Sequence, residues 1–390
     1  MSLSSPLTPL LQQAEPSFLR YGDDGSALVV ESFGEVEGEY AALRKSCVLI
    51  DLPQRGTLKI TGRDRLEFLG RMVTQELKGI APFKARSAFW LNRKGRIDAD
   101  LRLIELGEEM WADVDALVAA DAARSLMSFV FSENVSVQDV GESMHRLALH
   151  GPSAPAVLEA ASRPSAGPRL SALADGEACL VEMAGQRVIV DRRDTTGEIG
   201  LELLAEAKAA ADVYAALLEA GVGDGSGRLR PAGWAAYNIA RIEAGTPLFN
   251  IDFGPGNLPH ETGILEQRVS FTKGCYLGQE VVARMQSLGH PKQRLVALRV
   301  DEPGGREPGS DAAQPVSGST VLKPESDGGG AVGAVTSSTR SPMLGDAINC
   351  FAQVKWEATK PGTRLLVETD VGRTAAIVRP TLAFWTRAAE

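Results

Sequence analysis

Hydrophobic and polar residues alternate along several short stretches of the chain, and elsewhere the apolar residues recur every three or four positions. Residues 56–60 alternate, with Leu58 and Ile60 on one face, which predicts a strand. Asp64 then stands where a helix N-cap would, and apolar residues follow at helical spacing: Leu66, Leu69, Val73 and Leu77. This part of the chain therefore predicts a strand followed by a helix.

Both patterns continue along the chain, so strands and helices are mixed. Strands at 87–91 and 96–104 flank a turn at 92–95 and predict a hairpin. Further strands are predicted at 145–150, 186–191 and 200–204, and helices at 121–131, 155–161, 207–220 and 234–243. Gly221 follows the third of these helices, where a helix-ending glycine is expected. Hairpins mixed with helices favour an α+β class over a doubly wound parallel sheet.

The two ends of the chain differ in composition from its middle and predict a division into parts. Residues 1–35, with three prolines and a Gly-Asp turn cluster, are expected to form a loosely structured N-terminal lead-in. Residues 36–145 and 146–290 are expected to form two α+β parts. Short strands with turn signals predict a small β-domain over 291–390, with a Gly/Pro-rich surface loop or insertion at 302–330.

The acidic balance and the sparse cysteines narrow the class of protein. The 390 residues include 41 Lys and Arg against 50 Asp and Glu, a net charge of −9, which argues against general nucleic-acid binding. None of the four cysteines lies in a C-x-x-C pair, which argues against a disulfide framework or a zinc knuckle. No apolar run is long enough to span a bilayer, and no basic residue precedes Arg20. The sequence thus predicts a cytoplasmic protein with no metal site and no nucleic-acid or membrane partner.

The second strand of the predicted hairpin carries a first candidate site. Because side chains alternate along a strand, Asp98, Asp100 and Arg102 share one face. Two carboxylates at this spacing can perturb each other's pKa, and Arg102 could hold one of them ionised. On spacing alone, a solvated sheet face is the favoured explanation of the pattern.

The string TGEIGLEL carries a second candidate site. Glu198, Gly200 and Glu202 are expected on one strand face, and a glycine between two carboxylates would open room for a flat ligand. A carboxylate can accept two parallel hydrogen bonds, for example from the 2-amino-4-oxo edge of a pterin. On this segment alone, a solvated strand next to a turn is the favoured explanation.

The string ARIEAGTP resembles a helix end followed by a tight turn. Gly245 can take a positive φ, and Pro247 prevents the helix from continuing. Arg241, in the last turn, could bind a carboxylate bidentately, although a surface ion pair is the usual role of such an arginine.

The string KGCYLGQE places a cysteine between two glycines just before a predicted helix. The positive end of the helix and the charge of Lys273 would both favour the thiolate form of Cys275, which attacks or binds metal. The alternative is a buried apolar cysteine.

Taken together and in this order, these segments resemble the aminomethyltransferase-like superfamily. That superfamily contains the T-protein of the glycine cleavage system and the YgfZ folate-binding proteins. TGEIGLEL and RIEAGTPLFNIDF resemble its folate-site segments, KGCYLGQE resembles the YgfZ signature, and the similarity is clear over residues 47–294. The resemblance implies a three-domain, cloverleaf-like α+β fold with a C-terminal β-barrel, and tetrahydrofolate as the cofactor.

The resemblance also implies roles for individual residues. Glu198 falls where the family has its pterin-reading glutamate, and Arg241 where an arginine lines the folate site. Glu202, predicted on the same face as Glu198, is grouped with the folate-binding residues. Asp100 falls where T-proteins have their catalytic aspartate. T-proteins have two adjacent aspartates at this place, whereas here Ala99 separates Asp98 from Asp100.

Three functions follow from these residues. The leading prediction is a tetrahydrofolate-binding accessory protein for iron–sulfur cluster assembly or repair, whose partners are iron–sulfur enzymes or assembly proteins. Cys275 would be its reactive or ligating thiolate, with Lys273 beside it. The alternative is a folate-dependent aminomethyltransferase of the T-protein type, with Asp100 as the acid/base or electrostatic group. A scaffold with a vestigial pocket is the third.

Overall fold

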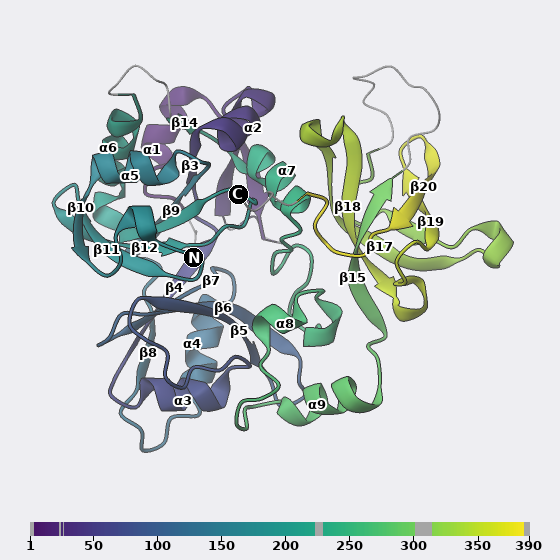
Figure 1. Cartoon of the computed structure of the whole chain (residues 1–390), viewed down its shortest axis with the longest axis horizontal. Coiled ribbons are helices and arrows are strands. Elements are labelled where there is room, and N and C mark those ends of the chain that lie inside the picture. Colours follow the sequence, from purple (N-terminus) through teal and green to yellow (C-terminus); the bar gives the residue numbers. More distant parts are fainter. Residues whose placement is uncertain (1–3, 23–24, 26, 223–228, 301–313, 386–390) are drawn as a thin grey trace. The chain divides into compact units, whose positions relative to one another are not determined.

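The computed structural model of the chain describes residues 4–22, 25, 27–222, 229–300 and 314–385 (Figure 1). Its internal contacts form two compact units. Unit 1 comprises residues 1–90 and 99–237, and unit 2 comprises residues 91–98 and 238–390. The domain boundaries expected from the sequence stay a prediction.

A five-stranded sheet forms the first layer of unit 1, in the order β5-β6-β7-β4-β8. The predicted hairpin is confirmed as β5 and β6, whose tip, residues 91–98, is grouped with unit 2. Helix α3 follows β4, and helix α4 follows β7. In chain order the elements of this layer are β4 (Arg55–Thr61), α3 (Arg65–Met72), β5 (Lys84–Leu91), β6 (Ile97–Glu105), β7 (Met110–Asp115), α4 (Ala119–Met127) and β8 (Ser136–Asp139).

A seven-stranded sheet forms the second layer, in the order β10-β11-β12-β13-β9-β3-β14. Neighbours are antiparallel except β14, which pairs in parallel with β3. Apolar side chains of α5 and α6 pack with those of β9, β11, β12 and β13 in one core, for example Leu158 and Leu217 with Leu149. The elements are α2 (Val36–Lys45), β3 (Cys47–Asp51), β9 (Met144–His150), α5 (Ala154–Ala161), β10 (Arg163–Ala166), β11 (Ala178–Met183), β12 (Gln186–Arg192), β13 (Gly200–Glu206), α6 (Ala210–Val222) and β14 (Leu229–Pro231).

Gly221 does not end α6, contrary to the prediction. The helix continues to Val222, and Gly221 lies inside it. A Cβ at Gly221 would overlap the side chain of Leu229, the first residue of β14. The glycine is therefore explained by the close approach of a strand rather than by a helix cap.

The described part of the N-terminal segment is ordered, so the prediction of a loose lead-in was wrong. It forms α1 (Thr8–Leu11) and a hairpin of β1 (Ser17–Tyr21) with β2 (Ala27–Ser32). Leu7 and Leu11, one helical turn apart, join Val30 in the core of unit 1. Pro6 and Pro16 lie just outside these short elements and Pro9 lies in the first turn of α1, and the density of prolines concealed the elements themselves.

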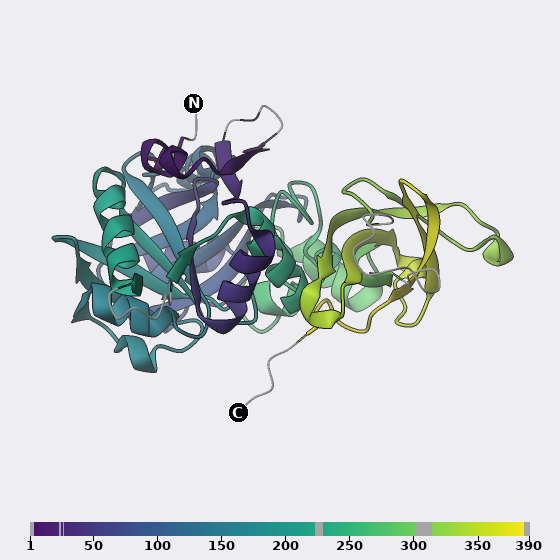
Figure 2. The ribbon, with the colours of Figure 1, turned by 90° about the horizontal axis from the view of Figure 1, so that it is seen from above.

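A closed six-stranded barrel forms most of unit 2, in the order β15-β18-β17-β16-β19-β20 (Figures 1 and 2). The α+β class and the C-terminal β-barrel are thus confirmed. β16 lies inside the stretch 302–330, which the sequence predicted to be a loop. The strand is only three residues long and is preceded by Gly and Ser, so no alternating pattern predicts it. The strands are β15 (Gln293–Val300), β16 (Thr320–Leu322), β17 (Ala331–Ser341), β18 (Ala347–Lys355), β19 (Arg364–Thr369) and β20 (Gly372–Val378).

The rest of unit 2 begins in α7 (Trp234–Ala244), which spans the boundary of the two units. It continues through α8 (Leu265–Arg268) and α9 (Gln279–Leu288). The tip of the β5–β6 hairpin packs on this segment. The Asn257 carbonyl accepts a hydrogen bond from the Ile97 N–H at 2.9 Å, and Gly95 lies against Val281 at the start of α9. Within the described residues, no helix is both long and apolar enough to cross a membrane.

Candidate functional site

Glu198 lies in a turn just before β13 and is held there by an arginine of α2. Arg44 Nη1 donates to the Thr196 carbonyl at 2.8 Å and lies 3.5 Å from Glu198 Oε1. The guanidinium of Arg44 also lies 5.4 Å from the centre of the Tyr40 ring. Glu198 is only 6% exposed, so Arg44 supplies the opposite charge that a buried carboxylate requires.

The turn that carries Glu198 is fixed by its own sequence. Gly197 has a φ of 79°, a conformation that glycine adopts at little cost. Asp194 Oδ1 accepts the Gly200 N–H at 3.0 Å, and the Tyr237 hydroxyl lies 3.3 Å from Thr195 Oγ1. These bonds fix the position of Glu198 just before the start of β13.

Gly200 does not open room for a ligand, so that expectation was wrong. A Cβ at Gly200 would overlap the Arg193 carbonyl oxygen and would lie 2.9 Å from His150 Nδ1. The space is filled by the buried imidazole of His150, on the neighbouring strand β9, and by the backbone at Arg193. The glycine therefore allows close packing of the protein itself.

Glu202 belongs to a buried charge network rather than to an open strand face. Its carboxylate lies 3.3 Å from Arg146 Nη1 and 3.5 Å from Arg193 Nη1. Asp113 of β7 joins both arginines, at 3.3 and 3.1 Å, and accepts two hydrogen bonds from Arg55 at 2.8 and 2.6 Å. Three arginines thus meet two carboxylates. We call these five residues the arginine network.

Charge within the arginine network decides the ionisation of Asp113. Burial alone would raise the pKa of this carboxyl, but the adjacent guanidinium groups, Arg55 first, hold it well below its ordinary range. Asp113 is completely buried, so the network depends on its charge.

The two aspartates of β6, Asp98 and Asp100, fall in different units. Arg102 forms its ion pair with neither of them, contrary to the prediction. Arg102 is buried and donates to both oxygens of Asp191 on β12, at 2.9 and 2.8 Å. Asp98 accepts a hydrogen bond from Asn92 Nδ2 at 2.9 Å, and partial burial raises its pKa. Asp100 is half-buried in unit 1. A buried guanidinium is stabilised by a carboxylate that accepts two hydrogen bonds, and for Arg102 this carboxylate is Asp191 of the other sheet.

Arg241 is fully buried in unit 2 and bonded to protein groups. Its Nη1 donates to Asp252 Oδ2 at 2.6 Å and to the Thr246 carbonyl at 3.1 Å, and its Nη2 donates to Ser337 Oγ at 2.7 Å. These bonds tie the turn after α7 to strand β17 of the barrel. Arg241 is therefore no surface ion pair. Its role toward folate stays a prediction, against which this burial weighs.

Cys275 is the exposed cysteine of the four, in the loop that precedes α9. Lys273 is 8% exposed, and its Nζ lies 5.2 Å from the centre of the Tyr276 ring. Burial raises the pKa of the other cysteines, that of Cys179 to about 11 and that of Cys350 to about 12, and raises that of Cys47 further. Those three cysteines lie in hydrophobic cores, and Cys275 does not.

Sequence analysis missed the basic residues around the candidate carboxylates. Arg44 is separated from Glu198 by 154 positions, and Arg146 comes from a strand that reads as apolar. Only Arg193, close to TGEIGLEL in the chain, stood near enough to be noticed. A pattern along one strand does not reveal which charges a second strand or helix brings to it.

Comparison with known proteins defines the class that this fold and these residues represent. The family model of the GCVT N-terminal domain matches residues 20–273, about two thirds of the chain. The matched range contains Asp100, Glu198 and Arg241 and ends before Cys275. The chain therefore belongs to the GCVT family of aminomethyltransferase-like proteins.

Individual relatives agree with this family. The chain is 32% identical to an aminomethyltransferase of Saccharopolyspora erythraea, over 85% of this chain and 84% of the relative. It is 29% identical to an aminomethyltransferase of Geobacillus kaustophilus, over 91% and 92%. The glycine cleavage system aminomethyltransferase T of Bartonella henselae has a similar fold, with a TM-score of 0.83 and 22% identity over 98% of both chains.

His150 predicts a pH dependence of stability that can be separated from that of the carboxylates. Burial, aided by the charges of Arg193 and Arg44, lowers its pKa to about 3, so the folded chain keeps the imidazole neutral. In the unfolded chain the pKa is about 6.5, so between these values the unfolded state binds one more proton. The stability is therefore full above about pH 6.5 and is lost as the pH falls toward 3.

Urea unfolding at pH 7 and pH 5 measures this effect. We expect the wild type to lose about 2 kcal/mol more than His150→Gln between these two values. The variant lacks the titrating ring but keeps the surrounding carboxylates, so it serves as the reference. Equal losses in the two proteins would contradict the assignment.

Proposed function

We propose that this protein is a tetrahydrofolate-dependent aminomethyltransferase, which moves a one-carbon unit from an aminomethyl donor to the folate. The observation that carries the proposal is the buried Glu198 carboxylate, fixed by Arg44 within the range that matches the GCVT family model. The relatives that cover almost the whole chain are named aminomethyltransferases, which favours transfer chemistry over a purely accessory role.

The residues present suit a pterin ring in their chemistry. A carboxylate that is charged and fixed in position accepts two parallel hydrogen bonds from an amino group and an adjacent ring N–H. Glu198 is such a group, because Arg44 supplies its opposite charge. Glu198 would hold the pterin edge, and bound tetrahydrofolate would supply the nitrogens that accept the one-carbon unit. Asp100, half-buried on β6, would stabilise or exchange a proton at the amine that reacts.

Two measurements on the purified chain test this proposal. Calorimetric titration with tetrahydrofolate should give saturable binding, and incubation with an aminomethyl donor should convert the folate to its methylene form. Asp100→Asn should lower turnover by about 100-fold or more, because an acid/base group contributes that much. Asp121→Asn, at an exposed aspartate paired with Arg124, is the control and should leave turnover unchanged. Absence of turnover with every donor, despite folate binding, would contradict the transferase.

A second candidate function rests on Cys275. This residue is exposed within KGCYLGQE, and the proposed transfer assigns it no role. It favours a folate-binding accessory role in iron–sulfur cluster assembly or repair, with the thiolate as the reacting or ligating group.

Cys275→Ser separates the two candidates. For the transferase, we expect the variant to keep folate binding and at least about half of the turnover, because the thiol is not among the groups that the transfer needs. For the accessory protein, the same variant would bind folate but fail to restore an iron–sulfur enzyme in cells that lack this protein. Asp100→Asn is the matched variant, since it would spare that rescue and remove turnover.

A further inference from the structure

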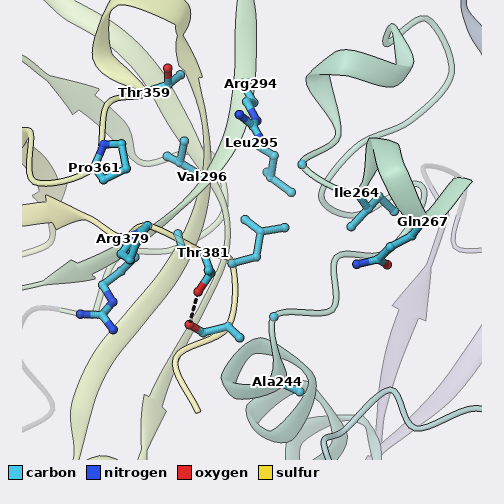
Figure 3. A pocket seen from close by; sticks show the side chains of 16 residues that line it. Ala244, Ile264, Gln267, Arg294, Leu295, Val296, Thr359, Pro361, Arg379 and Thr381 are labelled. Atoms are coloured by element: carbon cyan, nitrogen blue, oxygen red, sulfur yellow. Dashed lines mark hydrogen bonds between the residues drawn. The ribbon is translucent and has the colours of Figure 1, made fainter. Parts of the chain in front are cut away.

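A cavity of about 360 Å³ lies within unit 2, outside the residues assigned above (Figure 3). Its walls come from strand β15, the region from Gly263 through α8 and the C-terminal segment 379–383, with shorter contributions from the end of α7 and from Thr359 and Pro361. A volume near 350 Å³ falls at the lower end of the range for small-molecule sites.

The C-terminal wall of the cavity is built into the fold rather than loosely attached. The N–H groups of Phe384 and Trp385 donate to the Glu243 carbonyl at 2.9 and 3.0 Å. Gly245 and Gly263 have positive φ values of 79° and 75°. A Cβ at Gly263 would lie 2.9 Å from the Leu382 side chain, and one at Gly245 would overlap Ala383. The two glycines thus let the C-terminal segment lie close, and the cavity keeps its shape.

The charged groups of the cavity are all positive. Arg294 of β15 and Arg379 of the C-terminal segment are its two ionisable lining residues, and no acidic side chain lines it. Among the described residues, neither guanidinium has an ion pair or a side-chain hydrogen bond, although both arginines are exposed. Both guanidinium groups are therefore free of competing carboxylates in this part of the described structure.

Polar and apolar groups divide the remaining wall. In Figure 3 the Gln267 amide reaches from α8 toward strand β15, which carries Leu295 and Val296, and toward Thr381 of the C-terminal segment. The Thr381 hydroxyl donates to the Ala383 carbonyl at 3.1 Å and is therefore already used. Gln267 has no side-chain partner among the described residues, so an amide and two guanidinium groups remain for a ligand beside an apolar floor.

We propose that this cavity binds a small organic anion, with Arg294 and Arg379 holding its charged groups and Leu295 and its apolar neighbours contacting its carbon chain. Guanidinium groups bind carboxylate and phosphate through parallel N–H bonds, so both anions share the required chemistry. None of Asp100, Glu198 and Arg241 lines the cavity, and the inference does not depend on the proposed function.

Calorimetric titration of the full chain with glutarate and with inorganic phosphate tests the inference. We expect saturable binding of at least one anion with a Kd in the millimolar range, and at least about 10-fold weaker binding in the double variant Arg294→Gln/Arg379→Gln. Glutaramide, which has the same carbon chain without charge, should not bind. Tighter binding of glutarate identifies a carboxylate ligand, and tighter binding of phosphate identifies a phosphate ester.

Arg364→Gln is the matched control, because Arg364 is an exposed arginine of the same barrel that does not line the cavity. It should bind the anion as the wild type does. Unchanged melting temperatures of the ligand-free variants show that each is folded. Lack of saturable binding by both anions up to about 20 mM, or equal binding by the double variant, overturns the inference.

Discussion

Glu198→Gln should weaken tetrahydrofolate binding by at least about 100-fold, or about 2.7 kcal/mol. The carboxylate is proposed to accept two hydrogen bonds from the pterin edge. Glutamine keeps the shape but offers an N–H₂ group where the second acceptor is needed. It also removes the negative charge that faces Arg44 at 3.5 Å. Calorimetric titration of both proteins with tetrahydrofolate measures the loss directly.

Two further variants keep this test specific. Glu182→Gln changes an exposed glutamate of β11 in the same sheet and should bind folate as the wild type does. Arg44→Gln should weaken binding less than Glu198→Gln, because Arg44 positions the carboxylate and is not proposed to contact the ring. A dissociation constant for Glu198→Gln within about threefold of wild type would remove Glu198 from the folate site.

Asp113→Asn should reduce the free energy of unfolding by about 3–5 kcal/mol, the largest stability change expected here. Asp113 is completely buried and lies within 3.3 Å of all three arginines of the network. Without its charge, Glu202 would be the one remaining carboxylate of the network for three largely buried arginines. Removing one partner of a buried ion cluster leaves charge without compensation, and this costs more than the cluster itself contributes. Urea unfolding at neutral pH measures the change.

Restoring the charge balance provides the control for this prediction. The double variant Arg55→Gln/Asp113→Asn removes one positive and one negative charge together, so it should be more stable than Asp113→Asn alone. This comparison stays informative even if the single variant folds poorly. Asp139→Asn, at an exposed position of β8, should change stability by less than about 0.5 kcal/mol. A double variant less stable than the single one would show that packing, not charge, explains the effect.

The arginine network and the Glu198 turn illustrate how residues that are distant in sequence act together. Arg55, Asp113, Arg146, Arg193 and Glu202 come from two sheets and a connecting segment. No single segment contains both the acceptor and the donor of these pairs. The sequence singled out Glu202 as a ligand-facing carboxylate, whereas its neighbours in space use it as a counter-ion.

The amino-acid sequence by itself determined the α+β class, the hairpin of β5 and β6 and a small C-terminal β-domain, which the family resemblance further described as a barrel. These features depend on local periodicity and composition, which any single segment displays. Short strings such as TGEIGLEL also carried the family resemblance that the comparisons confirm at the level of the superfamily.

Only the tertiary structure decided what the individual polar residues do. Gly200 and Gly221 are small because a neighbouring strand or side chain lies against them, and Arg102 faces Asp191 of another sheet. The three-residue strand β16 closes the barrel although its sequence resembles a loop. Packing partners and counter-ions are brought together by folding over long sequence separations, so no pattern along one segment contains them.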